Sequence, residues 1–440
     1  MFKRLAFLFV VMWSGLSAQD NFEWKSNKER ISIPFKLVSN LIILPVEIND
    51  VELNMILDTG SESSMIFTLP ENDTLEFRNL KKVFLRGIGE SEKIEALYSD
   101  KNKLDIAGYT HQSFPLLLVL NQEVNISERL GVEVNGILNG SFFKNRIVEI
   151  NYESKQLIIH KEAKILQKKK YKKYERVPIK VFDNRPYITV DAAFGETKVS
   201  LNLLVDIGLS DGLWLFENDS IQSNATYFED ILGRGLSGEV VGKRSRVDNV
   251  RIKNFEFEQA LVSYPYQKYL PLLNYSERRN GSIGAGLMHR FHVVFDFQHN
   301  EILLKPNSKF SNPFHYNMSG LQIQHNGTDF FKETVSLTPA EGARIEKRVD
   351  HFVNGSENFL YKFVLKPVYE VAAVQKDSPA DLAGIQPGDK IIKIGNKSVQ
   401  NYTIQEINEI MQSEEGRWIY IDVQRKGRAI AFKFQLKKII

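Results

Sequence analysis

An internal repeat limits what this chain of 440 residues can fold into more than any other feature of its sequence. Three tetrapeptides return in the same order, the first two 148 positions later and the third 145 positions later. The pairs are Leu57-Asp58-Thr59-Gly60 with Val205-Asp206-Ile207-Gly208, Arg86-Gly87-Ile88-Gly89 with Arg234-Gly235-Leu236-Ser237, and Asn135-Gly136-Ile137-Leu138 with Asn280-Gly281-Ser282-Ile283. Because the order is kept and the spacing changes by so few positions, the sequence predicts two homologous halves.

Both halves have the pattern of β-structure. Short apolar runs at 37–48 and 51–57 are separated by Asn49-Asp50, a pair typical of a tight hairpin, and the second half repeats this pattern. Helical periodicity is nearly absent before residue 310, apart from short segments after Gly140 and Ala285. The sequence therefore predicts a mainly β chain with lobes at 31–160 and 178–306. The lysine-rich segment between them, 161–177, is expected to be a solvated linker.

The last third of the chain, 316–440, is expected to form a separate α+β module. A strand is predicted at 391–394, a helix at 403–411 and two further strands at 418–425 and 429–436. The helix begins after Thr403, and Glu406 follows at the spacing of a capping box.

The N-terminus has the pattern of a signal peptide. Lys3 and Arg4 precede the apolar run 5–13, and small residues lead to Ala18. Nine apolar residues are too few to span a bilayer, which needs about twenty. We therefore expect a signal peptide at 1–18, export to the periplasm or the outside, and no transmembrane segment.

Composition excludes several classes of function. The chain has no cysteine, which rules out disulfide scaffolds, Cys-ligated zinc, iron–sulfur clusters and cysteine nucleophiles. Its 57 basic and 54 acidic residues leave a net charge of +3, so no overall field favours nucleic acid. The eight histidines show no metal-binding spacing, and no cofactor or metal is expected.

Asp58 and Asp206 are the residues best suited to chemistry. Each ends an apolar run and is followed two positions later by a glycine, Gly60 or Gly208, which permits a tight turn and close approach of another chain segment. Two carboxylates held about 3 Å apart cannot both ionise and share one proton. Such a pair can activate water and polarise a carbonyl without a metal or cofactor.

The repeated turn resembles the active site of the aspartic proteases in their single-chain, retropepsin-like form. The resemblance covers about 33–160 and 178–306 and implies Asp58 and Asp206 as a catalytic dyad acting on polypeptides, with Thr59, Gly60, Ile207 and Gly208 in the active-site turns. It also implies a flap at Gly87, Ile88 and Gly89, which would close over an extended peptide.

Three positions depart from that family's pattern. Ile207 stands where the family has Thr or Ser, whose hydroxyl helps to link the two turns, Asn139 replaces a glycine, and Ser282 replaces an apolar residue. These departures leave an alternative open: a catalytically degenerate protease scaffold that binds peptides as an adaptor.

A serine nucleophile is a further alternative. The run 208–212 matches G-x-S-x-G with Ser210 at its centre. That motif requires a helix directly after the serine, whereas the apolar run 213–216 predicts a strand.

The C-terminal module resembles a PDZ domain of the kind attached to bacterial exported proteases. The resemblance rests on Ser378-Pro379-Ala380 through Gly384 and on Gly388-Asp389-Lys390-Ile391-Ile392. It implies binding of extended peptide segments or C-termini at a sheet edge beside the helix at 403–411. Ser319, Gly320 and Leu321 are the best match to the family's carboxylate-binding loop.

Overall fold

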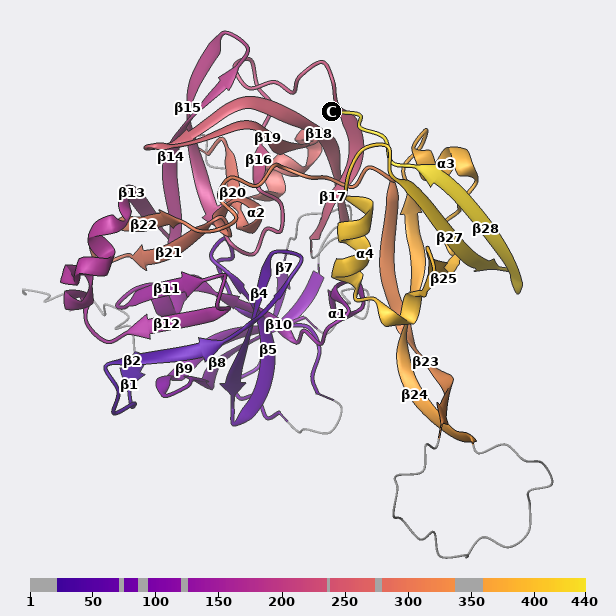
Figure 1. Ribbon diagram of the computed structural model, residues 1–440. Coiled ribbons are helices and arrows are strands. Elements are labelled where there is room, and N and C mark those ends of the chain that lie inside the picture. Colours follow the sequence, from indigo (N-terminus) through magenta and orange to yellow (C-terminus); the bar gives the residue numbers. More distant parts are fainter. Residues whose placement is uncertain are drawn as a thin grey trace, which may run out of the picture.

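The computed structural model describes residues 22–70, 75–85, 94–119, 126–235, 238–273, 279–336 and 359–440. Two β-lobes lie one above the other, and a C-terminal module packs beside them (Figure 1). The prediction of a mainly β chain is confirmed. The expected signal peptide at 1–18 and the expected flap residues Gly87, Ile88 and Gly89 lie outside the described residues.

The first lobe is a sheet in the order β1-β9-β6-β10-β5-β4-β8-β7, with β3 paired to β4. Asn49 and Asp50, between β4 and β5, both have positive φ, so this hairpin turns as its sequence predicts. The elements are β1 Phe22–Trp24, β2 Arg30–Pro34, β3 Lys36–Val38, β4 Leu41–Ile48, β5 Val51–Asp58, β6 Met65–Ile66, β7 Lys81–Leu85, β8 Ile94–Ile106, β9 Tyr109–Leu118, α1 Ile126–Leu130, β10 Gly136–Asn139, η1 Gly140–Phe143, β11 Ile147–Asn151 and β12 Gln156–His160.

The second lobe repeats this arrangement in a larger sheet that also includes β11, β12 and β2 of the first lobe. Its elements are β13 Glu175–Phe182, β14 Arg185–Phe194, β15 Thr197–Asp206, β16 Leu213–Leu215, β17 Phe228–Gly235, β18 Gly238–Ile252, β19 Phe255–Pro265, η4 Gln267–Leu273, β20 Gly281–Gly284, α2 Ala285–Met288, β21 Phe291–Asp296 and β22 Glu301–Pro306. The short helices η1 and α2 confirm the two helical segments expected after Gly140 and Ala285.

The sequence repeat is also a repeat of strand pairing. β10 runs parallel to β5 and antiparallel to β6, and β20 stands in the same relation to β15 and β16. Asn135 accepts a hydrogen bond from the Asn54 amide at 2.8 Å, and Asn280 accepts one from the Asn202 amide at 2.8 Å. The equivalent strands β11 and β21 pair antiparallel, as an approximate twofold axis between the lobes requires.

The lysine-rich segment between the lobes is only partly solvated, which corrects the expectation for 161–177. It forms two short 3₁₀ helices, η2 Ala163–Gln167 and η3 Lys169–Lys173. Leu166 and Tyr171 are buried against the sheet shared by the lobes, while the lysines remain largely outside. Burial of these two apolar side chains fixes the segment to the sheet.

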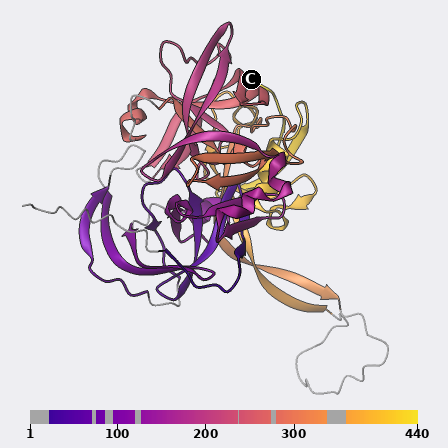
Figure 2. The ribbon, with the colours of Figure 1, turned by 90° about the vertical axis from the view of Figure 1, so that its left-hand side faces the viewer.

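The C-terminal module is a sheet in the order β23-β24-β25-β27-β28, with β26 paired to β25. The expected capping box is present, since Thr403 and Glu406 exchange hydrogen bonds at the start of α4. The elements are β23 Leu321–Ser336, β24 Phe359–Val374, α3 Pro379–Ala383, β25 Lys390–Ile394, β26 Lys397–Ser398, η5 Val399–Asn401, α4 Ile404–Met411, β27 Trp418–Arg425 and β28 Arg428–Gln435. The far end of the β23–β24 hairpin extends away from the rest of the molecule (Figure 2).

The C-terminal module packs against both lobes. The rings of Phe228 in the second lobe and Tyr316 lie 5.3 Å apart, and Gln322 donates to Asp230. From the first lobe α1 packs against β23, and a side chain at Gly131 would lie 3.6 Å from Ile404 Cγ2 in α4. Within the described residues no helix has the length and apolar character needed to cross a membrane.

Candidate active site

The two predicted carboxylates meet where β5 and β15 end. Asp58 accepts hydrogen bonds from the amides of Gly60 at 2.7 Å and Ser61 at 3.0 Å, and Asp206 accepts one from Gly208 at 3.1 Å. Each turn glycine lies against the carboxyl group of the other lobe: a Cβ at Gly60 would be 2.5 Å from Asp206 Cγ, and one at Gly208 would collide with Asp58. Glycine is therefore required at both turns because no side chain fits there.

Burial raises the pKa of both carboxyl groups. Burial, followed by the charge of Asp206, raises the pKa of Asp58 well above its ordinary value. Burial also raises the pKa of Asp206, against the lowering effect of the Arg279 charge and of a hydrogen bond with Asp58. The two carboxyl groups therefore titrate together as one pair.

Thr59 links the two turns from one side only. Its hydroxyl donates to the carbonyl of Val205 at 2.7 Å and accepts from the amide of Ile207 at 3.1 Å. Ile207 has no hydroxyl that could make the equivalent hydrogen bonds to the first turn. Its side chain is fully buried in the main core. One hydroxyl bridge and one packed aliphatic side chain thus hold the turns together.

Asn139 replaces a glycine without disturbing the first lobe. Its side chain donates to Glu62 and accepts from Ser64 and Ser141, so it caps η1 as well as filling the space. The equivalent Gly284 could not be replaced by a larger residue in this way, because a Cβ there would collide with the carbonyl of Asp211. The departure at Asn139 is therefore a local adaptation of one turn.

The structure places Ser210 in a setting unlike a nucleophile elbow. The residues after it form strand β16, as the apolar run predicts, rather than a helix. Asn40 of the first lobe donates to the Ser210 carbonyl at 3.0 Å, and the next residue, Asp211, accepts from Trp214 and Ser263. Ser210 is therefore part of a loop that joins the lobes.

Sequence inspection missed Arg279, the cation that acts on Asp206. Arg279 is 5% exposed and donates to Ser282 at 2.6 Å and to the carbonyl of Gly281 at 3.1 Å. This contact explains the hydroxyl at Ser282, which the repeat would otherwise make apolar. Extending the alignment of the halves by one residue pairs Arg279 with Val134 and would have revealed the substitution.

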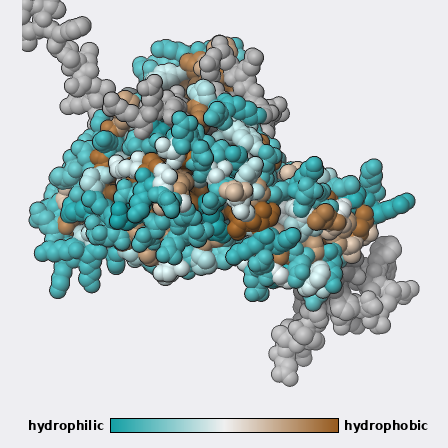
Figure 3. Space-filling model, turned by 90° about the horizontal axis from the view of Figure 1, so that it is seen from above, coloured by the Kyte–Doolittle hydropathy of each residue, from teal (hydrophilic) through white to brown (hydrophobic). Residues whose placement is uncertain are grey.

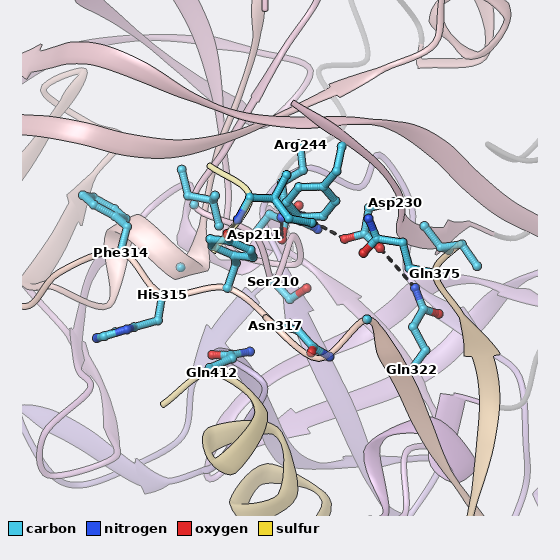
Figure 4. Close-up of a pocket in the computed structure, with 18 of the residues that line it drawn as sticks. Ser210, Asp211, Asp230, Arg244, Phe314, His315, Asn317, Gln322, Gln375 and Gln412 are labelled. Carbon is cyan, nitrogen blue, oxygen red and sulfur yellow. Dashed lines mark hydrogen bonds and ion pairs between the residues drawn. The ribbon is translucent and has the colours of Figure 1, made fainter. Parts of the chain in front are cut away.

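A separate cavity of about 970 Å³ lies between the second lobe and the C-terminal module (Figure 4). Arg244 bridges Asp211 and Asp230 across one wall, with N–O distances of 3.1 and 2.8 Å, and Gln322 reaches Asp230 from the other side. Neither Asp58 nor Asp206 lines this cavity. On the face seen in Figure 3, hydrophilic side chains predominate, and one of the small hydrophobic patches lies where the lobes meet this module.

The loop at 319–321 is closed by its own hydrogen bonds. Ser319 donates its amide and hydroxyl to Asn317 Oδ1, at 3.0 and 2.6 Å, and accepts from the amide of Leu321 at 3.0 Å. Gly320 has a φ of +79° and lies against Ser378. A peptide carboxylate would have to displace the Ser319 hydroxyl to reach the Leu321 amide.

Residues 370–425 match the family model described as a PDZ domain. The C-terminal module is a PDZ domain. A 69-residue stretch is 30% identical to a probable CtpA-like serine protease of Staphylococcus haemolyticus, and a 70-residue stretch is 33% identical to 26S proteasome non-ATPase regulatory subunit 9 of Mus musculus. Each match covers 16% of this chain and only 14% and 30% of the respective relatives.

Among solved structures, an aspartic proteinase from Irpex lacteus is similar to the chain at 11% identity, with a TM-score of 0.41. The comparison covers 64% of this chain and 99% of that protein. The two lobes are related to each other by the equivalent pairings of β10 with β5 and β6 and of β20 with β15 and β16. Within the described residues, no three His, Asp or Glu side chains gather as a metal site would require.

Proposed function

We propose that this chain is an aspartic-type endopeptidase in which Asp58 and Asp206 activate a water molecule. One observation carries the proposal: two homologous turns bring two buried carboxyl groups face to face, each accepting backbone amide hydrogen bonds. A pair that shares one proton supplies an acid and a base at the same point, which is what uncatalysed amide hydrolysis lacks.

In the proposed mechanism each carboxyl group has its own role in moving protons: Asp58 starts protonated and Asp206 starts charged. Charged Asp206 takes a proton from water as the oxygen attacks the peptide carbonyl carbon, and neutral Asp58 gives its proton to the carbonyl oxygen. The tetrahedral intermediate then collapses: Asp206 passes its proton to the leaving nitrogen, and a hydroxyl of the intermediate returns a proton to Asp58. The pair ends in its starting state, and no cofactor or metal takes part in these steps.

The PDZ domain would recruit substrates or partners by strand addition at the edge of β23, beside α4, which requires the segment of the first lobe around α1 and Gly131 to move away from that edge. The closed loop around Ser319 favours extended internal segments over free C-termini, since the Leu321 amide already has an acceptor. We further propose that residues 1–18 direct export, so that the substrates are polypeptides of the periplasm or the exterior.

Digestion of a peptide library from pH 3 to 8 tests the proposal. We expect cleavage by the wild type and its loss in both Asp58→Asn and Asp206→Asn, because either change removes the shared proton or the charge. Circular dichroism would establish that the variants are folded. Cleavage that survives both changes would overturn the dyad mechanism.

A peptide-binding adaptor on the same scaffold is the second candidate, favoured by the missing hydroxyl at Ile207. It predicts that the folded wild type cleaves nothing at any pH, while still binding peptides. A serine-reactive phosphonate separates a third possibility, since it would label Ser210 but not the carboxyl pair.

A further inference from the structure

The edge of the PDZ sheet at which a peptide would add as a strand faces the two lobes. β23 forms one edge of the described sheet and α4 lies beside it, so the groove between them is where a PDZ domain takes an extended peptide. At one end of this groove, Leu321 and Gln412 line the cavity of about 970 Å³ between the second lobe and the PDZ domain. The groove therefore begins at that cavity and runs toward the start of α4.

The first lobe fills the other end of the groove. Gly131 follows α1, and a Cβ placed on it would lie 3.6 Å from Ile404 Cγ2 in α4 and 4.0 Å from His325 Cδ2 in β23. Gly131 thus lies between the two walls of the groove, and α1 itself packs against β23 (Figure 1). Burial lowers the pKa of His325, against the opposing effect of the Glu128 charge in α1. A peptide strand could not pass this point without displacing the segment.

The segment that fills the groove is held on the first lobe by its own contacts. The Ser127 hydroxyl donates to the carbonyl of Val134 and accepts from the Val134 amide, both at 3.0 Å. The Gly131 amide donates to the carbonyl of Ser127 at 2.9 Å, and Leu130 is buried in one cluster with Ile56 of β5. The segment therefore belongs to the lobe and meets the PDZ domain as a neighbour.

The second lobe contacts the start of β23 less closely. Gln322 donates to Asp230 at 3.3 Å, and both residues line the cavity (Figure 4). The end of the groove near Leu321 therefore borders open space, whereas the end near Ile404 is filled.

We propose that α1 and Gly131 are an internal occupant of the PDZ groove, so that an extended polypeptide segment binds this domain only after the groove has separated from the first lobe. The docked arrangement is then the closed state of the PDZ domain. Because docking and ligand binding exclude each other, the apparent affinity for a ligand is reduced by the fraction of molecules whose groove is open. This inference rests on the peptide binding proposed for the PDZ domain and is independent of cleavage by the Asp58–Asp206 pair.

A disulfide across the contact tests the closed state. The chain has no cysteine, so Gly131→Cys together with Ile404→Cys introduces the only two thiols. A Cβ at Gly131 would lie 4.0 Å from Ile404 Cβ, within the range of about 3.5–4.5 Å that a disulfide requires. Binding is measured on an array of random synthetic peptides with the full-length protein, which also carries Asp58→Asn to prevent cleavage. We expect oxidation to lower binding by about tenfold or more and reduction to restore it, while the same protein without the two cysteines is unaffected.

Gly131→Arg tests the open state. Gly131 has a φ of +65°, so another residue is strained there, and an arginine must in addition push against Ile404. Gly195→Arg is the matched control, because Gly195 has a φ of +60° and a Cβ there would meet nothing within 4 Å. We expect Gly131→Arg to bind peptides about tenfold more tightly than Gly195→Arg does. Hydrogen exchange locates the bound peptide, since strand addition protects the amides of β23.

The outcomes separate this inference from the proposed function. Equal binding by the oxidised and reduced cysteine pair, or by Gly131→Arg and Gly195→Arg, overturns the inference but leaves peptide binding by the PDZ domain in place. Failure of the disulfide to form also overturns it, because the segment would then not lie in the groove. If Gly131→Arg does not fold, the disulfide comparison decides alone. If no form binds any peptide, the proposed recruitment fails together with the inference, and the digestion assay still tests the peptidase.

Discussion

Thr59 and Ile207 occupy equivalent positions but hold the turns that carry Asp58 and Asp206 in different ways. The Thr59 hydroxyl makes two hydrogen bonds to the other turn, while Ile207 contributes only packing. We expect Thr59→Val to leave a buried carbonyl and amide unpaired, at a cost of about 1–3 kcal/mol, and to lower kcat.

Ile207→Thr is the matched change at the other turn. It loses buried methyl contacts but adds a hydroxyl at the twofold-related position, so its effect on kcat should be smaller than that of Thr59→Val. Chemical unfolding and peptide cleavage measure both effects. A larger loss of activity in Ile207→Thr would show that packing, and not the hydroxyl, holds the dyad.

The raised pKa values of the two carboxyl groups predict the pH range in which the proposed peptidase would act. In the proposed mechanism the pair works while it holds one proton, between its two macroscopic pKa values. Burial raises the pKa of each carboxyl group above the ordinary 3.8. We expect the pH profile of kcat/KM to be bell-shaped and centred above that value. A profile that peaks below pH 3.8 and vanishes above it would contradict the shared-proton arrangement.

Glu149 on β11 binds the segment 161–177 between the lobes to the sheet that both lobes share. It pairs with His160 at 3.2 Å, with Tyr171 at 2.8 Å and with Lys170 at 3.2 Å. Burial alone would raise the pKa of Glu149, but the His160 and Tyr171 hydrogen bonds and the Lys170 charge lower it to about 2. The folded state therefore stabilises the ionised carboxylate.

The lowered pKa of Glu149 predicts how the stability of the protein depends on pH. A lowered pKa in the folded state contributes stability above the ordinary 4.5, and that stability is lost as the pH falls toward about 2. Glu149→Gln should lower the free energy of unfolding by about 2–3 kcal/mol at pH 7, with a difference that shrinks below pH 4.5. Glu162→Gln serves as the control and should show a much smaller dependence, because its pair with Lys164 lies in solvent, where such pairs contribute little. A pH-independent difference would contradict the role assigned to the charge.

Helix α1 shows how one short element joins two parts of the molecule. Leu130 belongs to a buried apolar cluster with Ile56 of β5, and the neighbouring Gly131 faces Ile404 of the PDZ domain. The helix has only five residues, and its sequence carries little helical periodicity. Its position depends on packing from both sides, which explains why sequence inspection did not find it.

At the scale of the whole molecule, Arg244 connects the loop that follows Asp206 to the side of the second lobe that faces the PDZ domain. It bridges Asp211, which follows the dyad turn, and Asp230, which contacts Gln322. Arg244→Met would leave two partly buried carboxylates without their cation and should cost about 3 kcal/mol or more. Calorimetry of the full chain measures this as a lower midpoint of unfolding.

Arg251→Met is the matched control, since its pair with Asp191 is more than half exposed and should contribute less than about 1 kcal/mol. Equal midpoints for the two variants would show that the Arg244 bridge does not stabilise the assembly of lobe and PDZ domain.

The sequence by itself determined the duplication, the mainly β class, the strand-ending Asp58 and Asp206, and the separate C-terminal module. These features are local, because hairpin turns, alternation of apolar residues, a capping box and a repeated tetrapeptide are each contained in short stretches of chain. The same locality explains why β27 was predicted with its observed bounds.

Only the tertiary structure decided which residues surround the carboxyl pair. The bridge from Thr59 to Val205, the burial of Arg185 and Arg279, the packing of Tyr171 and the contact of Gly131 with the PDZ domain join residues far apart in the chain. A carboxyl group's pKa depends on such neighbours, because desolvation and Coulomb forces act through space and not along the sequence.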